Sequence, residues 1–298
     1  MKGVSIIICT YNRAELLTEC LQSFLDQSIQ PDNIEFLVIN NHSTDNTREV
    51  TESFKGKLKD IRCVDESNIG LSFARNRGVH QAAYDWICYM DDDAIAHKNY
   101  LEQLFYTIDH FDFDGFGGMF YPWYRTPKPQ WLSPDFGKMT LLRRTAGPLA
   151  VGKTVAGGIC AFKKACIIAA GEFPTDVGMR GDVVGYGEEN YLQDKMWANG
   201  NIIGFNPDWA MDHLVAEYKY TLKWHLKRYW GKGRDAQINR GRLGLLQKIR
   251  IGAVSIATIV FLGFKNLPKL ILNKNYYRQN YCLDTLSHAY KQLGKISV

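Results

Sequence analysis

Residues 4–13 read VSIIICTYNR, a mostly apolar run that ends in four polar side chains. A short apolar run bounded by a polar turn is typical of a strand buried in a parallel sheet. Apolar residues then recur at helical spacing, and the strand pattern returns. Further strands are expected at 35–40, 61–65 and 86–90, and helices over 16–25, after 45 and over 71–84. This alternation predicts an α/β fold with a Rossmann-like, mostly parallel sheet flanked by helices.

The pattern is less regular after about residue 114. Here we expect strands at 115–124, 154–162, 201–205 and 209–215, a helix over 188–199, a Pro-rich loop near Trp123 and Trp131, and a Gly-rich loop from Gly178 to Gly187. Beyond Tyr218 the pattern is helical and basic. We therefore predict a domain over residues 1–235, with halves 1–115 and 116–235, and a helical, basic extension over 236–298.

Charge is unevenly distributed along the 298 residues, whose net charge is +5. Residues 219–278 hold fourteen Lys or Arg and one acid, Asp235, so the rest of the chain sums to −8 (22 basic minus 30 acidic). This segment mixes Trp and Tyr with cations and a short apolar run, which favours a helix lying in the headgroups of an anionic membrane. The alternative is a core-packing helix with a solvated basic face. Nucleic acid is not expected as a partner, because no recognised binding module accompanies the charge.

Three further features bear on location. The seven cysteines include no CxxC pair and are interpreted as reduced thiols of a cytoplasmic protein. The opening MKGVSIIICTYN lacks the pattern of a secretory signal. The longest uncharged stretch, Ile251–Phe264, has fourteen residues, whereas a spanning helix needs about 20. We therefore expect a cytoplasmic protein with peripheral contact at the inner face of the membrane.

Polar side chains follow all four strands predicted in the first half of the chain. They are Thr10-Tyr11-Asn12-Arg13, Asn40-Asn41-His42, Asp65-Glu66-Ser67-Asn68 and Asp91-Asp92-Asp93. Because ligands of such sheets bind at the carboxyl ends of the strands, this convergence predicts a ligand site.

The triplet Asp91, Asp92 and Asp93 indicates the chemistry of that site. Adjacent carboxylates repel each other unless a cation or hydrogen-bond donors offset the repulsion. Carboxylate oxygens at a strand end suit Mn²⁺ or Mg²⁺ shared with substrate phosphates. An acidic triplet can also be a solvated turn, but its place at the ligand edge favours the metal. His213, in the run MDHLV, is either a core residue or a further ligand.

Glu188 and Glu189 open a predicted helix directly after the Gly-rich loop. The helix dipole alone favours acids in a first turn, but a carboxylate there can also act as a general base toward a sugar hydroxyl. The glycines before them suit a loop that closes over a substrate. Arg75 and Arg77 lie either on a solvated helix face or against a diphosphate, which the guanidinium fork binds well.

Several segments, in this order, resemble glycosyltransferase family 2, a large family with the GT-A fold. They are VSIIICTYNR, FLVINNHSTDNT, SNIGLSFARNRG, YMDDDA, AGGICAFKKACIIAAGEF, YGEENYL, the His213 segment and YWGKGRDA. The resemblance covers roughly residues 3–235. It implies an inverting, metal-dependent glycosyltransferase that transfers a sugar from a nucleotide-diphospho-sugar to a saccharide or lipid-linked saccharide. Cell-surface polysaccharide or glycolipid assembly is the implied setting.

The resemblance also implies roles for individual residues. Asp93 would be the direct metal ligand, Asp91 would reach the ribose or sugar of the donor, and His213 would complete the metal site. Glu189 would be the base, with Glu188 as the alternative, because the family usually has Asp at position 189. The other donor-binding candidates are Thr10, Tyr11, Asn12, Arg13, Asn41, Arg75 and Asp92.

The chain departs from the family pattern at Asn40-Asn41, where Asp-Asp or Asp-Asn is common, and this leaves the preferred nucleobase open. The sequence leaves two alternative functions open. A nucleotidyltransferase would need a Gly-rich phosphate loop after the first strand, and TYNRAELL has no such glycines. A catalytically silent relative acting as a membrane scaffold would not need the acid triplet or the Glu188-Glu189 pair.

Overall fold

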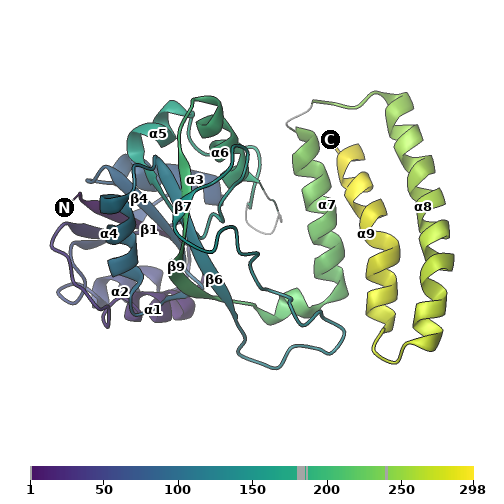
Figure 1. Ribbon diagram of the computed structural model, residues 1–298, viewed down its shortest axis with the longest axis horizontal. Coiled ribbons are helices and arrows are strands. Elements are labelled where there is room, and N and C mark those ends of the chain that lie inside the picture. The colour runs from purple at the N-terminus through teal and green to yellow at the C-terminus, as the bar shows by residue number, and fades with distance from the viewer. Residues whose placement is uncertain (1, 180–184, 186, 239–240) are drawn as a thin grey trace. The chain divides into compact units, whose positions relative to one another are not determined.

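The computed structural model describes residues 2–179, 185, 187–238 and 241–298 (Figure 1). Its contacts divide the chain into two compact units. Unit 1 comprises Met1–Trp123, Gly137–Asp176 and Glu188–Leu214, and unit 2 comprises Tyr124–Phe136, Val177–Gly187 and Val215–Val298. The chain therefore enters unit 2 three times.

The first four strands of unit 1 lie where the sequence predicts them. They are β1 (Val4–Thr10), β2 (Ile34–Asn40), β3 (Ile61–Asp65) and β4 (Trp86–Asp91), and they are parallel in the order β3-β2-β1-β4. Thr10 pairs with Asn40, Asn40 with Asp65, and Cys9 with Asp91. The polar residues that end these strands are thus brought to one edge of the sheet.

The remaining strands of unit 1 make the sheet mixed. They are β5 (Ala94–Ala96), β6 (Gly115–Trp123), β7 (Gly147–Pro148), β8 (Ile159–Lys163) and β9 (Ile203–Leu214). In the described residues the nine-stranded order is β3-β2-β1-β4-β8-β6-β9-β5, and β7 pairs with β9. Strand β8 runs antiparallel to β4, and β6 runs antiparallel to β8.

Two strand predictions in this half differ from the structure. The strands expected at 201–205 and 209–215 are one strand, β9, whose register against β6 shifts between Gly117 and Met119. This bulge accommodates Pro207, which has no N–H for the ladder and makes the sequence look interrupted. The strand expected at 154–162 begins only at Ile159, because residues before it form a turn.

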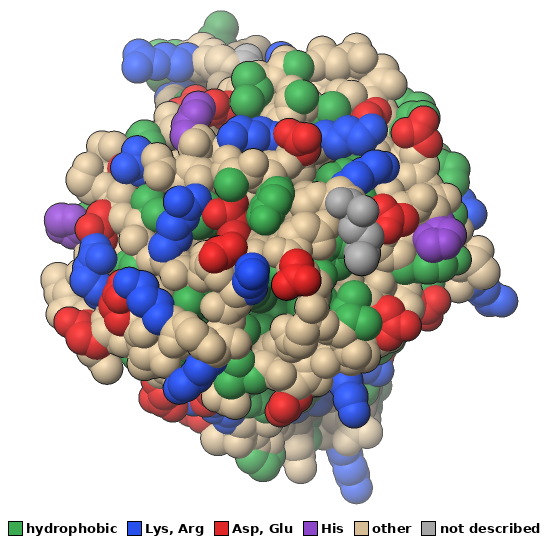
Figure 2. Space-filling view, turned by 90° about the vertical axis from the view of Figure 1, so that its left-hand side faces the viewer, with side chains coloured by type: hydrophobic (Ala, Val, Ile, Leu, Met, Phe, Trp, Pro, Cys, Tyr) green, Lys and Arg blue, Asp and Glu red, His purple; other side chains and the backbone are tan. Residues whose placement is uncertain are grey.

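Helices cover both faces of this sheet (Figure 1). They are α1 (Ala14–Gln22), α2 (Thr47–Ser53), α3 (Leu71–Gln81), α4 (Tyr100–His110), α5 (Lys164–Ala169) and α6 (Glu188–Ala198). Successive side chains of a strand point to opposite faces, so Ile6 and Ile8 enter one core while Ile7 enters the other. The first core includes residues of α1 and α4, and the second includes residues of α3, α5 and α6. Figure 2 shows a face on which acidic and basic side chains are interspersed.

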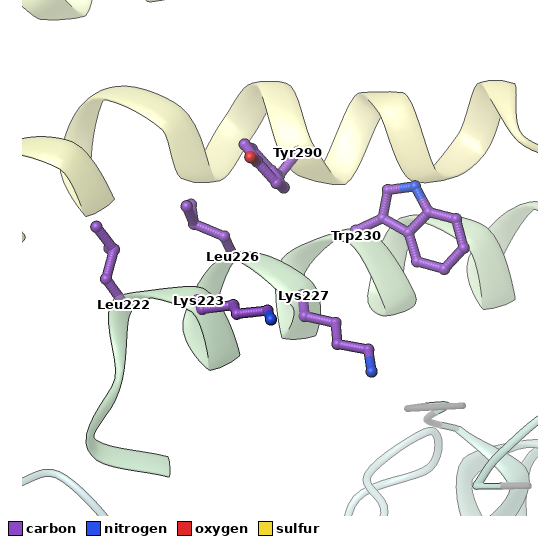
Figure 3. Close-up of a pocket in the computed structure, with 6 residues that line it drawn as sticks. All are labelled: Leu222, Lys223, Leu226, Lys227, Trp230 and Tyr290. Carbon is purple, nitrogen blue, oxygen red and sulfur yellow. The ribbon is translucent and has the colours of Figure 1, made fainter. Parts of the chain in front are cut away.

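Unit 2 is helical, with η1 (Glu217–Tyr220), α7 (Leu222–Ile238), α8 (Leu245–Leu272) and α9 (Arg278–Ile296). Helix α7 runs without interruption through the predicted boundary at 235/236. It approaches α9 closely at Gly294, where an added Cβ would lie 2.0 Å from the Trp230 carbonyl oxygen. A cavity of about 480 Å³ is lined by six residues of these helices (Figure 3). They are Leu222, Lys223, Leu226, Lys227, Trp230 and Tyr290.

The segment 124–136 packs inside unit 2. The ring centroid of Trp131 lies 5.2 Å from that of His225 on α7. The Asn280 side chain on α9 donates to the Trp131 carbonyl oxygen at 2.6 Å, and the Tyr277 hydroxyl lies 2.7 Å from Oε1 of Gln130. The predicted Pro-rich loop is therefore part of the helical unit.

Helix α8 is longer than its uncharged stretch, because it continues through charged residues on both sides of Ile251–Phe264. Among the described residues, it is the one helix long and apolar enough to cross a membrane, judged by length and composition. A core helix of a soluble protein can meet the same criteria, but only 6% of the apolar window of α8 is buried.

Candidate active site

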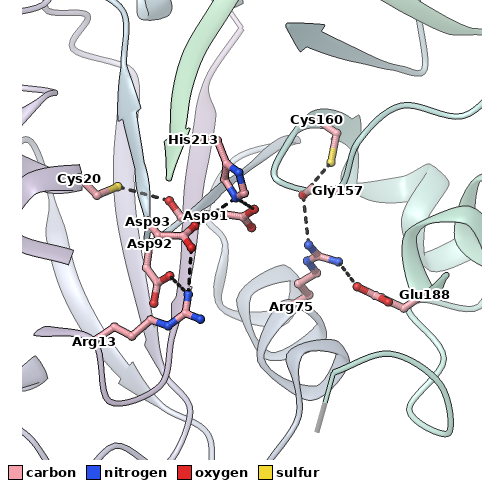
Figure 4. A network of polar contacts seen from close by, with 10 residues as sticks. All are labelled: Arg13, Cys20, Arg75, Asp91, Asp92, Asp93, Gly157, Cys160, Glu188 and His213. Carbon is pink, nitrogen blue, oxygen red and sulfur yellow. Dashed lines mark hydrogen bonds and ion pairs between the residues drawn. The ribbon is translucent and has the colours of Figure 1, made fainter. Parts of the chain in front are cut away.

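Three potential metal ligands meet where β4, β5 and β9 come together (Figure 4). Asp91 is the last residue of β4, and Asp93 directly precedes β5. Ala94 pairs with His213 of β9, which sets the imidazole beside both carboxylates. Nε2 of His213 lies 3.2 Å from Oδ1 of Asp93 and 3.5 Å from Oδ2 of Asp91.

The donor set of this cluster suits a divalent cation. One ligand atom from each of Asp91, Asp93 and His213 lies within 4.8 Å of the others. Two carboxylate oxygens and one imidazole nitrogen are ligands that Mn²⁺ accepts, and carboxylates also suit Mg²⁺. Burial lowers the pKa of His213, but hydrogen bonds to Asp91 and Asp93 outweigh it and raise the pKa to about 9. The proton on the imidazole thus offsets the repulsion between the two acids.

The middle carboxylate of the triplet has a different partner. Nη1 of Arg13, at the start of α1, lies 3.0 Å from Oδ1 of Asp92 and 3.2 Å from Oδ2 of Asp93. Burial raises the pKa of Asp92, and Arg13 acts in the opposite direction. The three acids therefore face two cationic groups, His213 and Arg13, and only the outer two share His213.

Two glycines on the turn before β8 keep the backbone close to these side chains. A Cβ on Gly158 would lie 2.1 Å from Oδ2 of Asp91. A Cβ on Gly157 would lie 2.9 Å from Nη2 of Arg75 and 3.2 Å from Cβ of Glu189. Adjacent glycines therefore border the metal-ligand cluster on one side and the Arg75 and Glu189 side chains on the other.

Arg75 and Glu188 form a buried ion pair. Nη1 of Arg75 lies 3.1 Å from Oε1 of Glu188, and Nη2 donates to the Gly157 carbonyl oxygen at 3.2 Å. The guanidinium carbon also lies 5.7 Å from the ring centroid of Tyr89 and 5.2 Å from that of Phe173. Burial and the neighbouring Glu189 raise the pKa of Glu188, while Arg75 opposes this.

Glu189 is only half-buried, unlike Glu188. Its helix is fixed against the turn before β8 by Gln193, whose side-chain amide both accepts from the Val155 N–H at 2.7 Å and donates to the Val155 carbonyl oxygen at 3.0 Å. Sequence reasoning missed Gln193, since a polar residue within a helix carries no special pattern. The predicted Gly-rich loop, Gly178–Gly187, lies largely outside the described residues.

The predicted nucleotide-binding residues lie at the carboxyl edge of β1 and β2. Thr10 is buried, whereas Tyr11 is 40% exposed. Asn12 has a φ of 53°, and its Oδ1 accepts from the Thr44 N–H at 2.7 Å. Asn41 is buried, donates to the Asn68 carbonyl oxygen at 2.6 Å and accepts from the Gly70 N–H at 2.8 Å. The Asn41 amide thus holds the loop that leads into α3.

The family-wide model described as glycosyl transferase family 2 matches residues 5–165 of this chain. The chain belongs to glycosyl transferase family 2. A glucosyl-dolichyl phosphate glucuronosyltransferase of Haloferax volcanii is 24% identical over 243 residues, which cover 79% of this chain and 76% of that protein. The glycosyltransferase GlyG of Streptococcus pneumoniae serotype 4 is 30% identical over 119 residues, 40% of this chain and 39% of GlyG.

Solved structures show that the family 2 chain has the expected fold. A mannosyltransferase of Pyrobaculum calidifontis, in complex with GDP-Man and Mn²⁺, superposes with a TM-score of 0.64 at 20% identity. The alignment covers 98% of this chain and 86% of that one. TarS 1–349 of S. aureus, in complex with UDP, gives a TM-score of 0.58 at 18% identity over 99% of this chain and 89% of that one.

Family 2 membership makes the chain a glycosyltransferase, and its likeness to solved structures shows the GT-A fold. The C-terminal extension is helical in the structure. All of its predicted site residues lie in unit 1. Sequence reasoning did not reveal which of them pair with each other, namely Arg13 with Asp92 and Arg75 with Glu188.

Proposed function

We propose that this family 2 protein is a metal-dependent, inverting enzyme that transfers a sugar from a nucleotide-diphospho-sugar to an acceptor hydroxyl. The observation that carries the proposal is the cluster of Asp91, Asp93 and His213. Glu189 lies close to this cluster, because Gly158 contacts Asp91 and the adjacent Gly157 contacts Glu189. A cation ligand set beside a half-buried carboxylate suits a displacement at a sugar phosphate, because the cation can stabilise the leaving group and the carboxylate can accept a proton.

Asp93, Asp91 and His213 are proposed to hold Mn²⁺ or Mg²⁺. A divalent cation held by these residues would supply positive charge that stabilises the diphosphate leaving group. The Mn²⁺ in the Pyrobaculum mannosyltransferase supports a cation in this fold. Because His213 must lose its proton to bind a cation, proton release should accompany metal binding.

The donor is proposed to be a nucleoside diphosphate sugar. Related structures contain UDP, UDP-GlcNAc or GDP-Man, which supports this class. Thr10, Tyr11 and Asn12 end β1, where the nucleoside of such a donor is expected to lie. Arg13 and Arg75 bring cationic groups to the same edge, and Asp91 and Asp92 complete the set of donor contacts. Because the Asn41 amide hydrogen-bonds to the backbone of the loop before α3, its proposed role is to hold the shape of the donor site.

Glu189 is proposed as the general base, and Glu188 as a positioning residue. Glu188 is occupied by the guanidinium of Arg75, whereas Glu189 is half-buried beside Gly157. The Glu189 carboxylate takes the proton of the acceptor hydroxyl as that oxygen bonds to the anomeric carbon. The bond from this carbon to the diphosphate oxygen breaks, and its electron pair leaves with the diphosphate. One such displacement inverts the anomeric centre.

The acceptor is proposed to be a saccharide or a lipid-linked saccharide, used in assembly of cell-surface polysaccharide or glycolipid. The name of the Haloferax relative describes an acceptor of the lipid-linked kind, which supports this proposal. The proposed location is the cytoplasm, peripheral to the inner face of the membrane. No nucleic-acid partner is proposed.

The test is a screen of UDP-, GDP- and dTDP-linked sugars for binding and slow hydrolysis by purified protein, with and without Mn²⁺. We expect one nucleotide class to bind in a metal-dependent manner and to release its nucleoside diphosphate. Binding that is indifferent to the metal would contradict the role of the cluster. Absence of binding to any donor by folded protein would favour a catalytically silent relative.

A further inference from the structure

Helix α8 presents large apolar side chains to solvent along one face. We define its outward face by Leu246, Ile249, Ile256, Phe261, Phe264 and Ile271, which are between 59% and 82% exposed. These six positions fall within one arc of the helix, since successive residues advance by about 100°. An apolar surface of this length on a soluble protein marks a site of contact with a partner.

The opposite side of α8 is more polar than its outward face. The two buried residues of the helix are Ser255 and Asn266. The Tyr281 hydroxyl of α9 lies 3.4 Å from the Gly263 carbonyl oxygen, so a small residue lies at this contact. A helix of a water-soluble protein normally turns its apolar face to the protein and its polar face to water. The outward face of α8 therefore carries more large apolar side chains than contact with water favours, and this supports contact with an apolar partner.

The charged residues within α8 and in the stretches of sequence that flank it are all basic. No Asp or Glu occurs between Asp235 and Asp284. Exposed cations lie before and after the apolar stretch of α8 and beyond its end, and they include Arg250, Lys265, Lys269 and Lys274. Long cationic side chains can keep their charge in the headgroup layer while their stems lie on apolar surface. An apolar face with basic flanks is complementary to a bilayer that contains anionic lipids.

The packing of α8 on α9 favours an orientation of α8 parallel to the membrane surface over one that crosses the bilayer. The uncharged stretch of fourteen residues, Ile251–Phe264, extends over only about 21 Å, less than the ~30 Å of hydrocarbon. Helix α9 carries exposed Asp284, His288 and Lys291. If α8 crossed the bilayer with α9 packed beside it, these polar groups would enter hydrocarbon, which is costly.

We propose that the outward face of α8 docks on the surface of an anionic lipid bilayer, with the helix axis in the membrane plane. The contact deepens the proposed peripheral location and rests on that part of the proposed function, not on the catalytic assignments. The apolar side chains reach the boundary between headgroups and acyl chains, and the flanking cations contact lipid phosphates.

The experiment is co-sedimentation of the full-length protein with vesicles of phosphatidylcholine alone or mixed with phosphatidylglycerol. We expect binding to be roughly tenfold tighter to the anionic vesicles, and to weaken as NaCl rises from about 0.05 to about 0.5 M. The double variant F261S/F264S should bind at least roughly tenfold more weakly. The variant K265Q/K274Q should lose preference for anionic lipid. The control Leu293→Ser replaces an exposed apolar residue of α9 and should bind like the wild type.

Three outcomes would overturn the proposal. The first is unchanged vesicle binding by F261S/F264S. The second is a wild-type dimer in solution that the same variant converts to a monomer, which would make a second copy the partner. The third is vesicle-bound protein that resists both high salt and alkaline extraction, which would indicate a spanning helix. Metal-dependent hydrolysis of the donor in solution is measured for the same variant. Retained hydrolysis with lost vesicle binding separates this contact from the proposed catalysis.

Discussion

Nε2 of His213 lies 3.2 Å from Oδ1 of Asp93 because β9 and β5 pair in a register that sets Ala94 opposite His213. The acid and the imidazole are far apart in sequence, so their contact depends on this antiparallel pairing at the edge of the sheet. A register shift of one residue would turn His213 to the other face of β9.

Replacement of Asp93 by Ala should remove metal binding and transfer together. The variant loses a ligand that also holds His213 and Arg13, so we expect the metal affinity to fall by at least roughly 100-fold and turnover by roughly 1,000-fold. Calorimetric titration with Mn²⁺ and a donor hydrolysis assay measure the two effects. Asp212→Asn is the control, because Asp212 contacts His97 at 3.1 Å and not the cluster. Near-normal turnover of the Asp93 variant would exclude the proposed metal site.

Addition of one methyl group at Gly158 should displace Asp91. The new Cβ would lie 2.1 Å from the Asp91 carboxylate oxygen, so the side chain must move. We expect the Mn²⁺ affinity of Gly158→Ala to fall by roughly tenfold or more. Gly252→Ala, which meets nothing within 4 Å, is the matched control. Equal Mn²⁺ affinity in both variants would contradict this prediction.

Exchange of each glutamate for glutamine should separate the roles of the pair. Glu189→Gln should keep donor affinity and thermal stability but slow transfer by about 10²- to 10⁴-fold, because it removes the proposed base. Glu188→Gln leaves Arg75 buried without its charged partner and should destabilise unit 1 by about 3–5 kcal/mol. Donor binding, single-turnover transfer and thermal melting are the measurements. A stable Glu188→Gln variant that has lost transfer would reverse the assignment.

The free energy of unfolding of unit 2 should decrease as the pH is lowered, because His225 becomes protonated. Burial lowers the pKa of His225 to about 4, and Arg228 adds to the effect. A folded-state pKa below the unfolded value of about 6.5 means that the contribution is complete above pH ~6.5 and declines toward pH ~4. We expect a loss of up to about 3 kcal/mol over this window.

The measurement is the free energy of unfolding as a function of pH for the wild type and His225→Leu. Other groups titrate in the same window, so the difference between the two curves isolates the histidine. Within the described residues, Nε2 of His225 has no hydrogen-bond partner, which agrees with a neutral imidazole. Parallel curves for the two proteins would contradict this prediction.

The first half of the sheet could be predicted from the sequence, because β1 to β4 are short apolar runs that end in polar turns. The edge at which those turns meet follows from parallel pairing alone. The second half was harder to predict. Pro207 within β9 looks like a break, since nothing in the local sequence reveals that a bulge opposite Gly117 and Met119 accommodates it.

The partners of the site side chains could not be predicted, because they depend on tertiary distances. Asn41 looks like a ligand to the nucleobase in sequence, yet both ends of its amide bind the backbone of the loop at Asn68 and Gly70. The sequence likewise gives no sign that the Arg75 guanidinium pairs with Glu188. Spacing along a chain indicates which groups reach an edge but not which neighbour each one contacts.

Because residues 124–136 belong to unit 2, this unit cannot fold in the order in which its parts are synthesised. A chain emerges from the ribosome N-terminus first, so Trp131 is released before His225 and Asn280, its neighbours in the folded unit, have been made. Strands β1 to β4 can form their part of the sheet while Trp131 is still exposed to solvent. The helical unit can therefore be completed only after α9, which carries Asn280, has left the exit tunnel.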